Sequence, residues 1–578
     1  MKRVLLKKSI TTPLNLSVAV FLTTVSVASS AESLPPTNSG TLIQQTQQGL
    51  IAPVPSDFTI QFDGNALTEA ASGGPQAVLK KLQITGTSVF TEEAILVGLG
   101  DILEKSYDLA GYRNLANTIS QFYRDRGYPF ARAYIPAQSM KNGELRIDVL
   151  EGKYGRATAR ATQDIQAQAQ AYLSTVMPNE VIESSKLERI SLIMNDIPGY
   201  KALPSISPGD RTGTANLNVL LIPEQQMFGD VTIDNQGSRY TGYNRVQSGV
   251  KKAHMFNFGD ELTARVMFTD EAMVFGNLGY SFAVMPNGLR GNAAYSQTRY
   301  SLGKEYSSLD AIGRSNIYSL GLSYPLVRSQ LTNINAKASF ERKELMDFYQ
   351  ASNNKLTKSI NSIPLSLAFD TRDQFLEGGI TYGALTLGFG DLNYDQDTAN
   401  TKGGFMKTTL DIARIQSLPA GFSMFIKGSI QKASQNLDSS EDLYLGGSNA
   451  VRAYPSGEAG VNGGGDEGYF TQVELRYSIN EYTPYVFYDA GRVNTYAKPT
   501  QSLTNETRDL AGGGVGLKYV RGDWSADVFA AWRTEGGAPV SDIYENAKPR
   551  VLGSLTYRFG GSKPAPIDGS TLTNGLVQ

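Results

Sequence analysis

The chain has 578 residues, with 53 Lys and Arg against 55 Asp and Glu, 58 Gly, 30 Tyr, 24 Phe, a single His and no Cys. This length exceeds one ordinary domain. The absence of Cys excludes disulfides and thiol chemistry, and the near-neutral charge gives no global attraction to nucleic acid. Abundant Gly and aromatic residues are typical of membrane β-barrels, whose aromatic side chains form girdles at both interfaces.

Residues 1–31 match a secretory signal peptide. The basic residues at its start are Lys2, Arg3, Lys7 and Lys8. The apolar stretch Leu14–Val27 follows and ends at the small residues Ser29–Ala31, which suit cleavage better than membrane anchoring. No later run of roughly eighteen apolar residues predicts a membrane-spanning helix.

Residues 32–76 read as a linker rich in Pro, Gly, Ser and Gln, with one short candidate helix at Thr41–Gln48. Residues 77–153 then predict a small α+β module. Its helices begin at Thr91 and Asp108, and its clearest strand is Glu144–Leu150. A looser copy spans residues 154–226, with helices near 167–173 and 185–193.

From residue 227 to residue 560 the pattern is that of strands alone. The segments Gln472–Tyr477 and Ser554–Phe559 alternate strictly between polar and apolar residues. We count about sixteen strands, and the gaps between them alternate between short ones, such as 480–483, and long ones, such as 342–359 and 441–468. Short turns on one side and long loops on the other favour an outer-membrane barrel over a soluble β-sandwich. Residues 561–578 form a C-terminal tail.

No enzyme signature is present. The sequence has no P-loop, no H-E-x-x-H, no complete G-x-S-x-G and no Cys/His metal spacing. The only histidine, His254, excludes a two-histidine metal site. The glycines at 512–514 lie in a predicted strand with no helix after it, so they do not form a phosphate cradle. We therefore expect no enzyme activity, no cofactor and no metal.

The longest gap carries an arginine in an unusual setting. Arg452 lies between the apolar residues Val451 and Tyr454, which favours a loop folded back into a polar lumen. One strand later, Asp489 is predicted to face inward, because a charge facing lipid costs about 2–4 kcal/mol at the midplane. The sequence therefore predicts a buried pair between Arg452 and Asp489, which can be bidentate.

These residues resemble a known family. Val451-Arg452-Ala453-Tyr454 is similar to the V-R-G-Y/F loop motif of the BamA/TpsB superfamily, although Ala453 replaces the usual Gly. Phe487-Tyr-Asp489-Ala-Gly491 resembles its F-x-D-x-G strand motif. The segment Asp234–Gly242 resembles the first barrel hairpin of two-partner secretion transporters, the ShlB/FhaC/HecB family.

The resemblance implies a sixteen-stranded transmembrane β-barrel preceded by two periplasmic POTRA domains, residues 77–153 and 154–226, with residues 32–76 as a plug segment. It implies export of a large partner exoprotein, which could be an adhesin, a haemolysin or a contact-dependent toxin. The motif residues Val451, Arg452, Ala453, Tyr454, Phe487, Asp489 and Gly491 are expected to lock the loop in the lumen. On the first POTRA domain the expected cargo-binding residues are Leu109, Tyr112, Leu115, Ile119, Phe122 and Tyr123.

Two alternatives remain at this point. A barrel-assembly insertase of the same superfamily would normally carry about five POTRA modules, and a passive porin would need neither the modules nor the Arg452 loop. The expected partners are the exoprotein, outer-membrane lipid and the barrel-assembly machinery, and we expect a monomer that binds no nucleic acid. The tail at 561–578 is unusual for such barrels, which normally end at the final aromatic residue.

Overall fold

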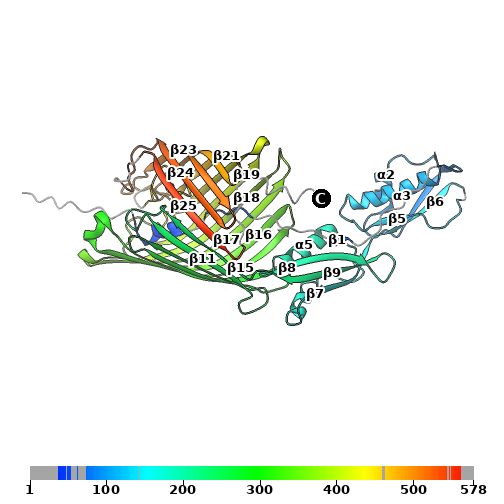
Figure 1. Cartoon of the computed structure of the whole chain (residues 1–578), viewed down its shortest axis with the longest axis horizontal. Coiled ribbons are helices and arrows are strands. Elements are labelled where there is room, and N and C mark those ends of the chain that lie inside the picture. Colours follow the sequence, from blue (N-terminus) through cyan, green and yellow to red (C-terminus); the bar gives the residue numbers. More distant parts are fainter. Residues whose placement is uncertain are drawn as a thin grey trace, which may run out of the picture. The chain divides into compact units, whose positions relative to one another are not determined.

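The computed structural model describes residues 37–46, 49–53, 61–62, 73–140, 142–458, 463–542, 546 and 548–561 (Figure 1). The predicted signal peptide, residues 47–48 of the expected plug helix and residues 562–578 of the tail lie outside this part of the chain. Of the helices within it, none combines the length and apolar character needed to cross a membrane.

The first module is a sheet covered by two helices. Its elements are β2 (Ala77–Leu79), β3 (Lys81–Thr85), α2 (Glu92–Leu99), β4 (Lys105–Tyr107), α3 (Leu109–Arg124), β5 (Arg132–Tyr134) and β6 (Glu144–Leu150). The sheet order is β3-β6-β5, and β2 pairs with β4. Both helices begin where the sequence predicts, because Thr91 accepts from the N–H of Ala94 and Asp108 from that of Gly111. The short pair β2 and β4 was not predicted.

The second module has the same kind of architecture and its own apolar core. Its elements are β7 (Lys153–Arg160), α4 (Gln166–Ala171), α5 (Ser184–Asn195), β8 (Tyr200–Pro208) and β9 (Thr214–Pro223). A two-residue strand of the linker, β1 (Gln61–Phe62), pairs in parallel with β8, which gives the sheet order β1-β8-β9-β7. The linker therefore occupies the edge of the second module that β8 would otherwise leave open.

The remaining strands close into one barrel in sequence order, which confirms the predicted sixteen-stranded barrel (Figure 1). They are β10 (Met227–Asp234), β11 (Arg245–Ala253), β12 (Glu261–Thr269), β13 (Val274–Ala283), β14 (Arg290–Ser301), β15 (Ala311–Arg328), β16 (Thr332–Tyr349), β17 (Asn354–Asp373), β18 (Gly379–Tyr394), β19 (Gly403–Ser417), β20 (Phe422–Ala433), β21 (Glu467–Tyr477), β22 (Tyr482–Asn494), β23 (Thr507–Arg521), β24 (Trp524–Glu535) and β25 (Arg550–Phe559). The 3₁₀ turns η1 (Lys304–Leu309), η2 (Gln350–Ser352) and η3 (Pro419–Gly421) lie between strands. The barrel closes where β10 pairs antiparallel with β25.

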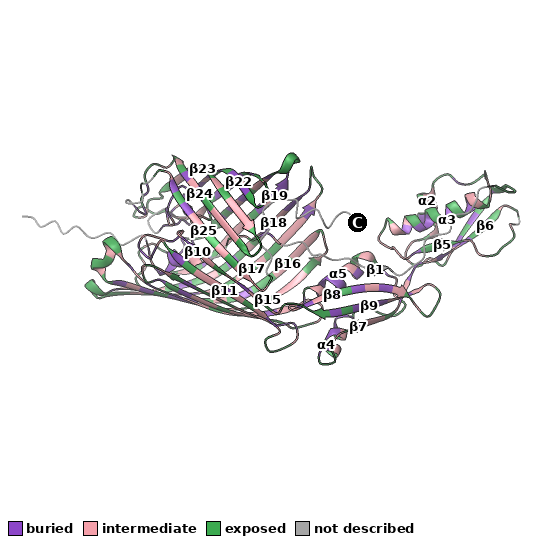
Figure 2. Ribbon diagram, viewed as in Figure 1, coloured by how far each residue is buried: buried purple, intermediate pink, exposed green. Residues whose placement is uncertain are grey.

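The alternation of side chains explains why this sheet can close into a barrel with a polar interior. On β21, Val473 and Leu475 are exposed on the outer wall, whereas Glu474 and Arg476 are buried inside. On β24, Trp524 and Trp532 lie an even number of residues apart, so they share a face, and both are exposed. Figure 2 shows this banding of exposed and buried residues along the strands. An apolar outer face and a polar interior are the pattern of a lipid-embedded barrel.

Two predicted boundaries were wrong. The long gap predicted at 342–359 is mostly strand, because β16 continues to Tyr349 and β17 begins at Asn354. The helix predicted at Thr41–Gln48 is α1 (Ser39–Thr46), which begins two residues earlier. Asn38 sets this earlier start, since its side chain accepts from the N–H groups of residues 40 and 41.

Candidate functional site

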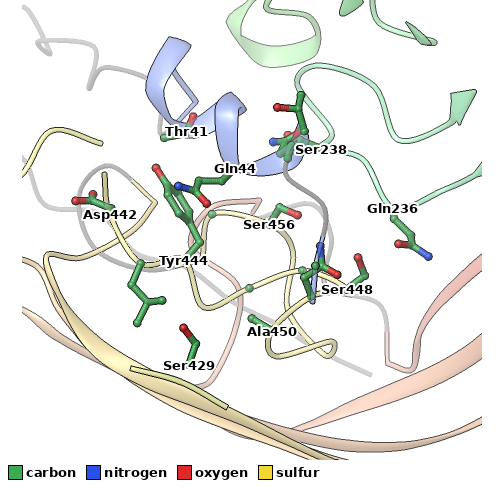
Figure 3. Close-up of a pocket in the computed structure, with 18 of the residues that line it drawn as sticks. Thr41, Gln44, Gln236, Ser238, Ser429, Asp442, Tyr444, Ser448, Ala450 and Ser456 are labelled. Atoms are coloured by element: carbon green, nitrogen blue, oxygen red, sulfur yellow. The ribbon is translucent and has the colours of Figure 1, made fainter. Parts of the chain in front are cut away.

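The interior of the barrel holds a long loop and a helix beside a cavity of about 1120 Å³. The loop comprises residues 434–466 between β20 and β21, and we call it loop 6. The helix is α1, which contacts β14, β15 and β16. Figure 3 shows the cavity with Thr41 and Gln44 of α1 and Tyr444, Ser448 and Ser456 of loop 6 among its lining residues. The lumen is therefore occupied by two segments of the chain itself.

The side chain of Arg452 is bound to strand β22 inside the barrel. Its Nε and Nη2 atoms lie 2.8 and 2.7 Å from the two carboxylate oxygens of Asp489, and its backbone N–H donates to the same carboxylate at 3.0 Å. Arg452 is 4% exposed and Asp489 is fully buried. The predicted contact is present, and its bidentate geometry fixes the orientation of the arginine as well as its distance.

Two further groups hold the same guanidinium. Glu474 on β21 lies 2.5 Å from Nη1 of Arg452, and the ring centroid of Phe487 lies 3.7 Å from the guanidinium carbon. The ring face of Phe487 therefore adds a cation–π contact to the two carboxylates. Sequence reasoning missed Glu474, although the alternation of Gln472–Tyr477 placed it on the polar face of a strand.

Two wall glycines make room for loop 6. A Cβ at Gly491 would lie 2.7 Å from a methyl group of Leu445, and a Cβ at Gly512 would lie 2.3 Å from the Cβ of Ala453. Both distances are too short for real carbon atoms, so only glycine lets the loop approach the wall this closely. The glycine at 512 also explains how Ala453 fits where the related motif has Gly.

The other motif residues anchor the loop beside the arginine. Val451 and Tyr454 are both fully buried. The Val451 N–H donates to the carbonyl of Leu445 at 2.7 Å, which folds the tip of the loop back on itself. The hydroxyl of Tyr454 lies within hydrogen-bond distance of two carbonyl groups, those of Glu535 at the end of β24 and Gly537 just beyond it. The structure thus brings all seven predicted loop and strand residues into one cluster.

A second set of buried charges fixes the base of loop 6. Glu441 lies 2.5 Å from Nζ of Lys343 and 2.7 Å from Nζ of Lys407, while Asp438 lies 2.6 Å from Nζ of Lys358. These lysines come from β16, β19 and β17. Buried charges are tolerated only when they are paired, so the base of the loop is matched to the charges of the wall. Sequence reasoning missed these pairs, because Lys343 and Lys358 lie in the segment predicted as a long loop.

Helix α1 docks on the wall through its first turn. The backbone N–H and the hydroxyl of Ser39 both donate to the carboxylate of Asp347 on β16, each at 2.8 Å. The unpaired N–H groups at a helix N-terminus favour a carboxylate at this position. Asp347 also accepts from the hydroxyl of Tyr300 on β14. The helix is therefore held at a specific site rather than lying loosely in the lumen.

The same helix packs against loop 6. A Cβ at Gly40 would lie 2.3 Å from Oγ of Ser439, and that hydroxyl donates to the side chain of Asn38 at 2.9 Å. Leu42 is fully buried in an apolar cluster that includes Tyr240 of the loop between β10 and β11 and Phe275 of β13. Helix, loop and wall are thus in mutual contact.

The predicted cargo-binding residues on α3 do not form a surface. Tyr112, Leu115, Ile119 and Tyr123 are buried in the core of the first module, and Phe122 is half-buried against it. Only Leu109 is exposed, at 56%. The helical spacing of these residues is that of a core-facing stripe, so the four buried side chains cannot contact a partner while the module is folded.

Comparison with known proteins identifies the family to which this architecture belongs. Residues 213–519 match the family model described as haemolysin secretion/activation protein ShlB/FhaC/HecB, and residues 77–152 match the ShlB-type POTRA domain. The first match covers most of the barrel strands and more than half of the chain. It includes the loop and strand motifs that surround Arg452.

Similar proteins agree with the family match. The chain is 29% identical over 477 residues to the heme/hemopexin transporter protein HuxB of Haemophilus influenzae (strain 86-028NP), covering 79% of this chain and 83% of that protein. It is 22% identical over 529 residues to the outer membrane transporter CdiB of Dickeya dadantii (strain 3937), covering 85% and 86%. The structure of CdiB from Escherichia coli aligns with a TM-score of 0.68 at 18% identity, covering 86% of this chain and 93% of that one, and shows the same fold. The chain therefore belongs to the ShlB/FhaC/HecB haemolysin secretion/activation family and is an outer-membrane transporter of the two-partner secretion type, with its POTRA domains in the periplasm.

Proposed function

We propose that loop 6 and α1 together close the barrel lumen at rest, and that export of the partner exoprotein requires both to be displaced. The observation that carries the proposal is the buried bidentate pair between Arg452 and Asp489. It fixes the tip of a long loop inside the pore, on the path that a transported chain would take. Loop 6 is tied to the wall at its base as well, through Asp438 and Glu441.

The pair is suited to holding a loop without being needed to hold the barrel. The barrel is stabilised by a continuous ladder of backbone hydrogen bonds between neighbouring strands. Removing one partner of a buried ion pair leaves an uncompensated charge, which costs roughly 3–5 kcal/mol locally. We expect this cost to be met by release of the loop, because the loop can move into water while the wall cannot.

The test is to compare export by Arg452→Ala and Asp489→Ala with export by the parent chain. We expect both variants to reach the outer membrane as heat-modifiable barrels and to secrete the partner poorly. The matched control is Arg492→Ala on the strand that carries Asp489. It removes an exposed ion pair with Asp509 of β23 and should change little. Normal secretion by Arg452→Ala would contradict the proposed role of the pair.

We propose that the first POTRA domain receives the partner before export. The two edge strands of its sheet are β3 and β5, and β5 packs beside α3. In the second module, by contrast, the edge at β8 is covered by β1. An extended chain can add to an open sheet edge through backbone hydrogen bonds with little demand on its sequence. Leu109 is the one predicted cargo-binding residue with an exposed side chain that could contribute.

Deleting residues 77–153 should abolish secretion while the barrel still assembles. The reason is that this module has its own apolar core and contributes no strand to the barrel. Secretion can be measured as partner protein in the medium or on the cell surface, and assembly by heat modifiability. Continued secretion by the truncated chain would overturn the receptor role.

We further propose that transport is the only activity of this chain and that one copy suffices. The related proteins are described as transporters, and the barrel closes on its own strands without a second subunit. Insertion is expected to use the barrel-assembly machinery.

A further inference from the structure

Glu458 lies at the tip of loop 6, six residues beyond Arg452, and is the most completely satisfied carboxylate of the loop. It is fully buried. One of its oxygens accepts from Nη2 of Arg508 at 2.8 Å and from the backbone N–H of Val540 at 2.7 Å. The other accepts from the backbone N–H and the hydroxyl of Ser541, at 2.8 and 2.5 Å.

These partners come from two places outside loop 6. Arg508 is at the start of β23, and residues 540–541 belong to the loop between β24 and β25, which we call loop 8. A carboxylate removed from water is costly unless its oxygens are paired. Glu458 meets that condition only with loop 8 in place, so its burial and the position of loop 8 depend on each other.

Asp542, the next residue of loop 8, contacts the loop between β10 and β11. The hydroxyl of Tyr243 donates to Asp542 at 2.6 Å, and Nε of Arg239 lies 3.9 Å from the same carboxylate. Both residues belong to the loop between β10 and β11. Residues 540–542 are therefore held from one side by loop 6 and from the other by the first hairpin of the barrel.

These contacts lie at the loop ends of β10 and β25, the two strands that close the barrel. β10 and β25 pair over only six residues, from Gly229–Phe559 to Asp234–Ser554. Beyond the last pair, the side chain of Asn235 accepts from the N–H of Gly553 and donates to the carbonyl of Val551. Loop 8 and the first hairpin therefore connect the two strands just past the end of their ladder.

We propose that Glu458 is a second anchor of loop 6 that couples it to loop 8, so that release of the Arg452 pair also frees loop 8 from the first barrel hairpin. Glu458 is a positioning residue, because it acts through residues 540–542. The coupling depends on the proposed function only in that loop 6 moves during export. The existence of the anchor can be tested without any transported partner.

The experiment uses the absence of native cysteine. Ser541→Cys gives the full chain a single thiol at a position that is 8% exposed, and it keeps the backbone N–H that Glu458 accepts. A membrane-impermeant maleimide added to intact cells then reports the opening of loop 8. The parent for every comparison is Ser541→Cys alone, with heat modifiability as the check that the barrel is folded.

Adding Glu458→Ala should raise the labelling rate by roughly tenfold or more, since several hydrogen bonds to a charged group are lost. Glu458→Gln preserves the size of the side chain and should also raise it, because its amide group cannot accept from both pairs of donors. The matched control Glu506→Ala removes an exposed glutamate of the neighbouring loop and should leave labelling unchanged. Equal labelling of the parent and Glu458→Gln, or an equal rise in Glu506→Ala, overturns the anchor.

The coupling is tested with Asp489→Ala in the same Ser541→Cys chain. Within the described part of the chain, Asp489 has no hydrogen bond with loop 8 and accepts only from Arg452, so a rise in labelling must pass through loop 6. We expect such a rise. Unchanged labelling in Asp489→Ala overturns the coupling even if Glu458→Ala is labelled fast. Raised labelling with normal secretion would instead count against the proposed function and leave the anchor in place.

Discussion

At the scale of single residues, Arg452 makes unequal contacts with the two acids beside it. Asp489 receives three hydrogen bonds from Arg452, whereas Glu474 receives one and also lies 2.7 Å from Nη2 of Arg476. Phe487 supports the guanidinium from one face. The arginine is thus the shared partner, and the two acids are not equivalent.

This inequality predicts an order of effects on secretion. Glu474→Gln should weaken export less than Asp489→Ala, because it removes the charge of one contact, worth about 1.5–3 kcal/mol, and keeps an acceptor. The variant that combines both changes should fall to the level of Arg452→Ala, since all three alter one network. Secretion assays on the four variants decide this. A Glu474→Gln loss as severe as that of Arg452→Ala would contradict the predicted inequality of the two acids.

The residues of this site were predictable from the sequence in part. Arg452 and Asp489 were paired because a charged residue inside an apolar motif and an inward-facing acid need each other in a low-dielectric wall. Glu474 was missed, since a polar residue on an alternating strand looks like any lumen residue until the loop is placed. Glu458 gave no signal, because two of its four donors are backbone N–H groups and all four lie about 50 or more residues away in the chain.

At the scale of elements, the first POTRA domain depends on side-chain caps at its two helices and on a buried carboxylate. In the first POTRA domain, Glu151 is almost fully buried where β6 ends. It accepts from the N–H groups of Ser88 and Val89 at 2.6 and 2.8 Å and from the hydroxyl of Tyr123 at 3.1 Å. Burial alone would raise the pKa of Glu151, but these hydrogen bonds outweigh it and hold the pKa below its usual value.

This shift predicts an acid-sensitive module. A carboxyl whose folded pKa is lowered stabilises the fold fully above the unfolded pKa of about 4.3, and the contribution is lost as pH falls through the lower folded pKa. Glu151→Gln should therefore be less stable at neutral pH and should lose less stability between about pH 6 and about pH 3. Thermal unfolding of residues 77–153 across this range measures it. Parallel pH curves for the two proteins would exclude Glu151 as the cause.

The element pattern also shows where sequence reasoning is reliable. Helices capped by Thr91 and Asp108 were placed correctly, because a side-chain cap is a local signal. The strands around 342–359 were not, since Lys343 and Lys358 resemble loop residues in the sequence but pair with acids of loop 6 in the lumen. The spacing on α3 was read correctly as helical, but whether its apolar face is core or surface depends on the sheet that covers it.

At the scale of the whole molecule, loop 6 and α1 are held in the lumen at separate points of the wall. The tip of loop 6 is fixed by Arg452, its base by the wall lysines and α1 by Asp347. A transporter that must admit a long polypeptide needs a closed resting state that can be reversed without breaking the barrel. Contacts made by a few groups of loop 6 and by the first turn of α1 meet this need, because they are separate from the strand ladder of the barrel.

The central claim is that the partner passes through the lumen that α1 occupies at rest. The most direct test is to pin the helix to the wall with Ser39→Cys and Asp347→Cys, whose native side chains approach to 2.8 Å, in a chain that has no other cysteine. We predict that the cross-linked protein does not secrete, that a reductant restores export, and that each single variant remains competent. Undiminished export by the fully cross-linked protein would contradict the account.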